Sequence, residues 1–163
     1  MPESFIQQNT PMVFARIQPG EELFSSVYRI CEEHGIQSGA VVGCIGSLTK
    51  TTYTYVAEIE DSPLGIGYLE TKVLHRPTEL LSAQGTIGRN KDTNQLDMHM
   101  HALMIDTDAK ITAGHLLPGC IVCATIEMVI AVAQDGSIVR GMDPALGVPV
   151  FLYKSIFSAP VEK

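Results

Sequence analysis

The chain has 163 residues, of which 45% are hydrophobic, and it carries a formal net charge of −7. This length is typical of one domain with one core, and the composition excludes an intrinsically disordered chain. The acidic balance disfavours strong non-specific binding to nucleic acid, because such binding comes mainly from Lys and Arg side chains that neutralise phosphates. We therefore expect a single globular domain over residues 1–163.

We find neither a secretory signal nor a membrane-spanning segment in the sequence. The N-terminus has no basic stretch followed by an apolar one, so we expect no secretory signal. The longest apolar run, 121–133, contains Glu127 and is too short to span a bilayer. We expect a cytoplasmic protein with no membrane partner and with reduced cysteines, which are Cys31, Cys44, Cys120 and Cys123.

The N-terminal third predicts a strand followed by the main helix. Pro11–Ile17 reads as a strand that ends at the turn pair Pro19-Gly20. Glu21–His34 then has helical spacing of apolar residues, with Gly35 as its stop signal. The apolar face of this predicted helix consists of Leu23, Val27, Ile30 and Cys31.

From Gly39 onward, short apolar and β-branched runs between turn residues predict strands. Ala40–Ile45 is expected to pair with Thr51–Ile59 across a turn at Leu48–Lys50, before a loop that contains Pro63. The further predicted strands are Tyr68–Leu74, Leu80–Ile87, Met98–Ile105, Lys110–His115, Ile121–Val132 and a C-terminal pair within 137–155. Hairpin turns are predicted at Asp106–Asp108, Pro118-Gly119 and Asp135-Gly136.

One early helix followed by many strands predicts an α+β fold. We expect a largely antiparallel, barrel-like sheet with the helix packed on it. The run Ile121–Val132 is apolar on both strand faces. It is either a central strand covered on both sides or a strand that packs against another subunit.

Three histidines form the most informative pattern in the chain. His99 and His101 are two apart on a predicted strand, so both imidazoles point to the same face. His115 ends the next predicted strand, and antiparallel pairing would bring it back beside them. Three imidazoles can hold one transition metal and leave a fourth position open; the alternative is a set of exposed or hydrogen-bonded histidines. Asp97 shares the face of His99 and either orients an imidazole or solvates the strand end.

Two carboxylates and one glycine-rich segment complete the candidate residues. Glu79 and Glu127 lie in apolar surroundings and are either acid/base groups beside a metal or buried structural acids. Gly43–Ser47 lacks the spacing of a phosphate-binding loop and indicates a bend where another backbone comes close.

Five short motifs occur in one order: Ile45-Gly46-Ser47-Leu48, Glu79-Leu80-Leu81-Ser82, His99-Met100-His101, Ala113-Gly114-His115-Leu116 and Thr125-Ile126-Glu127. This series resembles the plant and prokaryote conserved (PPC) domain, which occurs in AT-hook nuclear proteins of plants and as stand-alone prokaryotic proteins. The resemblance implies a homotrimer of α+β subunits with a core at about residues 13–134. It also implies a metal, zinc or another transition metal, on His99, His101 and His115.

Two functional hypotheses follow. In the first, the protein is a metal-binding regulatory or binding module, DNA-associated as the resemblance implies, although the chain has no Arg-Gly-Arg arm. A local positive face for DNA could then come only from Lys72, Arg76 and Arg89. In the second, it is a small metal-dependent enzyme with Glu79 or Glu127 as general base.

Overall fold

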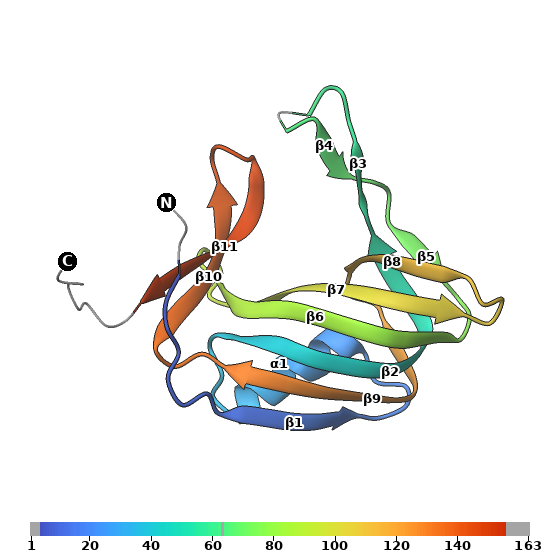
Figure 1. Ribbon diagram of the computed structural model, residues 1–163, viewed down its shortest axis with the longest axis horizontal. Helices are drawn as coiled ribbons and strands as arrows, with labels where there is room; N and C mark the ends of the chain where they lie inside the picture. The colour runs from blue at the N-terminus through green and yellow to red at the C-terminus, as the bar shows by residue number, and fades with distance from the viewer. Residues whose placement is uncertain (1–3, 63, 156–163) are drawn as a thin grey trace.

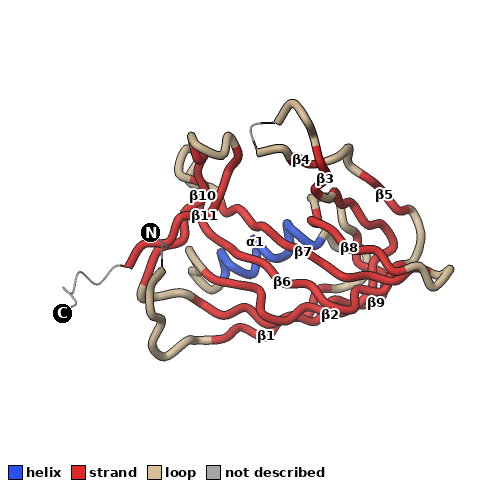
Figure 2. Tube along the Cα trace, turned by 45° about the horizontal axis from the view of Figure 1, so that its top comes forward, coloured by secondary structure: helices blue, strands red, loops and turns tan. Residues whose placement is uncertain are grey.

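The computed structural model describes residues 4–62 and 64–155, which form one helix against a large sheet (Figures 1 and 2). The helix is α1 (Leu23–Glu33), and Pro63 of the predicted loop lies outside the described residues. Among the described residues, no helix has the length and hydrophobicity needed to cross a membrane. The strands are β1 (Met12–Ile17), β2 (Gly39–Thr54), β3 (Val56–Glu58), β4 (Ile66–Tyr68), β5 (Lys72–Leu74), β6 (Thr78–Asn90), β7 (Leu96–Asp106), β8 (Ile111–Leu116), β9 (Ile121–Val132), β10 (Gly136–Asp143) and β11 (Val148–Ser155).

The main sheet has the strand order β1-β9-β2-β8-β7-β6-β10-β11, and β5 joins β2. Its pairings are antiparallel except for a short parallel contact between β10 and β6. The predicted antiparallel sheet with one helix is therefore confirmed. The whole sheet is not a closed barrel, because its edge strands β1 and β11 do not pair with each other, but β2, β8, β7 and β6 form a closed circuit through the pairing of β6 with β2.

Two predicted turns are corrected by the path of β2. Residues 39–54 form one continuous strand, so the predicted hairpin at Leu48–Lys50 is wrong. Register shifts against β9 let β2 bend there without reversing direction. Pro118-Gly119 joins β8 to β9, but these strands pair with β2 and not with each other. The predicted close backbone approach is confirmed at Gly46, because a Cβ there would collide with the Thr125 carbonyl oxygen.

Glu22 caps the N-terminus of helix α1, and the predicted stop residue Gly35 follows its C-terminal end. The Glu22 carboxylate accepts hydrogen bonds from the backbone N–H of Ser25 at 2.7 Å and of Gly119 at 2.9 Å. Gly35 follows the helix with φ of 66°, a conformation that favours glycine. The buried face of the helix contains Leu23, Phe24, Val27 and Cys31, which pack into the core with the inner face of the sheet.

Strand alternation sets the direction of the histidines. On β7, Met98, Met100 and Met104 are buried in the core, so the intervening His99 and His101 point to the opposite face of the sheet. Strand β9 follows the same rule, with alternate residues such as Ile126 and Ile130 buried. Its other face is only partly covered within one chain, which disfavours a strand buried on both sides by its own subunit.

Candidate metal centre

The three predicted histidines lie together on two paired strands. His99 and His101 come from β7, and His115 comes from β8, directly opposite His101 in the register. The Nε2 atoms of His99 and His101 are 2.9 Å apart. One ligand nitrogen from each of the three imidazoles lies within 4.8 Å of the others. One cation can therefore contact all three side chains, and this group contains no carboxylate and no thiol.

Tyr68 is a neighbour of the centre that sequence reasoning missed. Its hydroxyl lies 3.3 Å from Nδ1 of His115, and its ring stands edge-on to that imidazole. A partner on Nδ1 leaves Nε2 of His115 free to bind a metal and fixes the orientation of the ring. Asp97, considered above as a partner that orients His99, lies beside Arg140. Its carboxylate lies 3.6 Å from the guanidinium of Arg140.

The surroundings of His99 and His115 favour the neutral form of these two imidazoles, which is the form that binds metals. Burial, followed by the charges of His99, His101 and Arg140, lowers the pKa of His115 to about 4. Burial, followed by the charges of His101 and Arg140, also lowers the pKa of His99. Neutral imidazoles need not release a proton to take up a cation at neutral pH. The donor set therefore fits a transition-metal ion such as Zn²⁺.

The low pKa of His115 predicts acid sensitivity of the metal-free protein. The unfolded chain binds a proton on His115 near pH 6.5, whereas the folded chain binds it only near pH 4. Unfolding therefore takes up a proton in this window, and stability is expected to fall as the pH drops from about 6.5 to about 4. We expect urea midpoints of chelator-treated protein to decrease over that range.

The variant His115→Gln isolates this contribution, because other groups also titrate in acid. It should show a flatter dependence of the urea midpoint on pH, while the exposed control His75→Gln should keep the slope of the natural protein. Parallel slopes in all three proteins would contradict the assignment.

Glu79 and Glu127 lie away from the histidines. Both are exposed on the outer side of the sheet, so the alternative that they are buried structural acids is wrong. Glu79 pairs with Ile105 on β7, and Glu127 pairs with Ile45 on β2. They line surface hollows of about 730 and 570 Å³, whereas His99 and His101 line a separate hollow of about 510 Å³.

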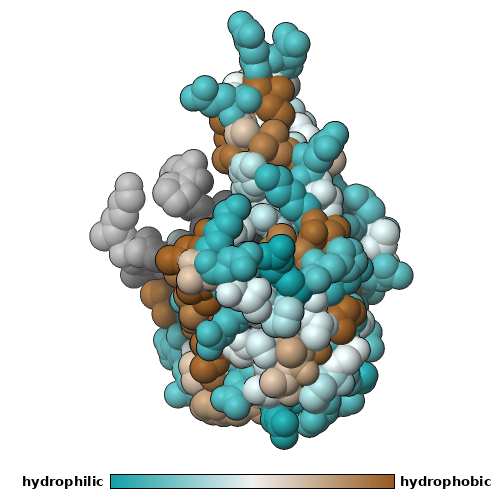
Figure 3. All heavy atoms as spheres, turned by 90° about the vertical axis from the view of Figure 1, so that its right-hand side faces the viewer, coloured by the Kyte–Doolittle hydropathy of each residue, from teal (hydrophilic) through white to brown (hydrophobic). Residues whose placement is uncertain are grey.

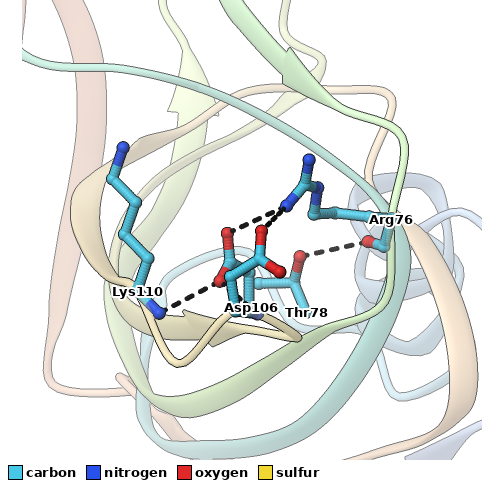
Figure 4. Close-up of polar contacts among 5 residues, drawn as sticks. Arg76, Thr78, Asp106 and Lys110 are labelled. Carbon is cyan, nitrogen blue, oxygen red and sulfur yellow. Dashed lines mark hydrogen bonds and ion pairs between the residues drawn. The ribbon is translucent and has the colours of Figure 1, made fainter.

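The basic residues expected to form a positive face make hydrogen bonds or ion pairs with other groups of the same chain. Arg76 lies 2.5 Å from a carboxylate oxygen of Asp108 and 3.6 Å from one of Asp106, an arrangement drawn in Figure 4. Arg89 donates to the backbone carbonyl of Asn94 at 2.6 Å, and Lys72 donates to the hydroxyl of Tyr55 at 2.9 Å. Arg76 in particular has two acidic neighbours that compete with any phosphate.

The cysteines do not contribute to this centre. All four are free thiols, and Cys31, Cys44 and Cys120 are buried. Burial raises the pKa of Cys44 to about 12 and that of Cys120 to about 11. The side chains grouped closely enough to hold one metal include no cysteine, so within the described residues the histidines alone form the candidate site.

Part of a longer curated protein is similar in sequence to this chain. A curated relative from Synechococcus sp. (strain JA-3-3Ab), named bifunctional protein GlmU, is 29% identical over 132 residues. That match takes in 81% of this chain but only 19% of the relative, so the chain spans about a fifth of that protein's length.

Two solved structures share the fold. A metal-containing protein from Archaeoglobus fulgidus superposes with a TM-score of 0.74 and 22% identity, over 93% of this chain and 99% of its own. A candidate DNA-binding protein from Bacteroides thetaiotaomicron gives 0.69 and 22%, over 91% and 96%. The family of Plants and Prokaryotes Conserved (PCC) domains matches residues 6–134, which is most of the chain. The protein therefore belongs to the PCC (or PPC) domain family.

Proposed function

We propose that the protein binds one transition-metal ion, with zinc as the first choice, through His99, His101 and His115, and acts as a homotrimeric binding or regulatory module. The observation that carries this proposal is the convergence of three imidazoles from two paired strands. Zinc on three imidazoles keeps a fourth position for water or a ligand. The name of the Archaeoglobus relative, a metal-containing protein, supports a metal in this fold.

Metal content tests this proposal. Protein purified without chelator should contain about one ion per chain by elemental analysis, and His101→Ala should contain almost none, since two imidazoles are too few ligands for a tight site. His75→Ala removes an exposed histidine outside the cluster and should keep the ion. A metal content near zero in the natural protein, or an equal metal content in all three proteins, would refute the proposal.

The homotrimer is supported by two exposed apolar surfaces of different shape. The outer sheet face exposes Phe14, Val42 and Ile45, with 78%, 45% and 53% of each residue accessible. The arm, β3 with β4, stands away from the sheet and exposes hydrophobic side chains along it, among them Val56 and Ile66 (Figure 3). Two different surfaces can meet head to tail, and such contacts close into rings.

The name of the Bacteroides relative suggests DNA binding, but the negative charge of this chain disfavours it. Each chain carries −7, and Arg76 is paired with two aspartates, so few phosphates could be neutralised. We expect random-sequence duplex DNA to bind more weakly than ~100 µM at physiological salt. Fluorescence anisotropy across a salt series measures this. Micromolar affinity with a steep salt slope would make DNA binding the primary function.

A small metal-dependent enzyme is the second candidate function. The observation that favours it is access, since His101 is exposed and lies on the hollow of about 510 Å³. A water molecule or a substrate could reach an ion from that side. Hydrolysis of an activated ester by zinc-loaded protein, lost in His101→Ala and kept in His75→Ala, would favour this candidate.

A further inference from the structure

A further cavity, of about 250 Å³ and separate from the three hollows described above, reaches His115 of the histidine cluster. It lies at the end of the sheet where the β10–β11 hairpin stands (Figure 1). Its wall includes Tyr28 from α1 and His115 from the end of β8. Its polar lining comes from Asn90, Asp97 and Arg140. His115 thus belongs both to the cluster and to the wall of this cavity.

Arg140 provides the positive charge of the cavity. Its side chain is only 14% exposed, and the Asp97 carboxylate lies 3.6 Å from Nε, beyond hydrogen-bonding distance. The guanidinium carbon sits 5.2 Å from the centre of the Phe151 ring. Within residues 4–62 and 64–155 no hydrogen bond takes up the five N–H donors of this guanidinium, although its charge also acts on His99 and His115. The guanidinium is therefore held in place while donors remain for a ligand.

Apart from the Asp97 carboxylate, the other polar groups of the cavity do not oppose an anion. The side-chain oxygen of Asn90 accepts from the backbone N–H of Asp92 and Thr93, which leaves its NH₂ group as a donor. Burial raises the pKa of Tyr28 to about 12, so this phenol stays neutral. Asp97 is the negative charge on the wall, and its charge is balanced by Arg140.

We propose that this cavity binds a small oxyanion, a carboxylate or a phosphate, between the Arg140 guanidinium and the fourth position of the ion held by the three histidines. The inference rests on the proposed metal site, because a divalent ion supplies the positive charge in excess of the Arg140–Asp97 pair. A planar guanidinium matches carboxylate and phosphate oxygens in two-point contacts. The volume is below the usual range for drug-sized ligands, so the ligand has few non-hydrogen atoms.

Calorimetry with two probes tests the proposal. Zinc-loaded protein is titrated with inorganic phosphate and, separately, with succinate, and the stronger of the two identifies the oxyanion class. Arg140→Gln is expected to bind that probe at least about 10-fold more weakly, as for the loss of a charge-assisted contact. Arg29→Gln removes the same charge from an exposed arginine on α1 and should bind as the natural protein does.

A second variant acts in the opposite direction and protects the test against misfolding of Arg140→Gln. Asp97→Asn removes the carboxylate that competes for the guanidinium, so it should bind the probe several-fold more tightly. Unchanged affinity in both Arg140→Gln and Asp97→Asn would overturn the inference, as would a zinc-loaded natural protein that binds neither probe at millimolar concentration. Metal content is measured first, so a failure to load zinc refutes the metal site, whereas loaded protein without probe binding refutes the oxyanion site alone.

Discussion

Ile45→Glu is expected to convert the proposed homotrimer into monomers. Ile45 is 53% exposed on the outer face of the sheet. It lines the hollow of about 570 Å³ together with Phe14 and Val129. An interface on this face would bury a glutamate carboxylate without a partner, which costs several kcal/mol. Sedimentation equilibrium at micromolar concentration should give three times the 17.7 kDa chain mass for the natural protein and the single-chain mass for the variant.

Met142→Glu is the matched control for this experiment. Met142 is 55% exposed, almost the same fraction as Ile45, but it lies on the β10–β11 hairpin and outside both apolar surfaces. This control should sediment as the natural protein does. A clean monomer for the natural protein, or an Ile45→Glu variant that stays assembled, would refute the proposed interface.

Gly46→Ala is expected to lower the free energy of unfolding by roughly 3–5 kcal/mol, a loss typical of backbone strain and collision in a core. Gly46 has φ of 145°, which side-chain-bearing residues rarely adopt. A Cβ would also collide with the Thr125 carbonyl oxygen and approach the Ile126 Cα, both backbone atoms of β9. Relief would require β2 and β9 to separate at the centre of the sheet.

Gly43→Ala provides the comparison within the same strand. A Cβ on Gly43 meets no atom within 4 Å, so this variant should change the free energy of unfolding by less than about 1 kcal/mol. Urea denaturation of both variants measures the difference. Equal midpoints would show that the approach of β9 at Gly46 is not a constraint on the fold.

The histidine cluster could be predicted because it depends on short-range patterns. His99 and His101 share a face by strand alternation, and the turn after Asp106 returns the chain so that His115 faces His101. The Asp106 carboxylate accepts backbone hydrogen bonds from Asp108 and Lys110, which stabilises this turn. The helix was predictable for a similar reason, since its apolar spacing, its Glu22 cap and Gly35 are all local signals.

The features that could not be predicted from the sequence depend on contacts between segments that are distant along the chain. Tyr68 reaches His115 from the arm, 47 residues earlier in the chain, and no periodicity in the sequence links them. Arg140 approaches Asp97 from β10 in the same way. The path of β2 was missed because Leu48–Lys50 looks like a turn locally, while pairing with β6 and β9 holds it extended.

X-ray absorption at the metal edge tests the central claim most directly, because it identifies the element and its ligands together. The three-histidine assignment predicts zinc, or another transition metal, with three imidazole nitrogens at about 2.0–2.1 Å and one further light-atom ligand. His115→Gln should lose the metal signal, because two imidazoles are too few ligands for a tight site. A protein without metal, or a metal with sulfur ligands at about 2.3 Å, would contradict the assignment.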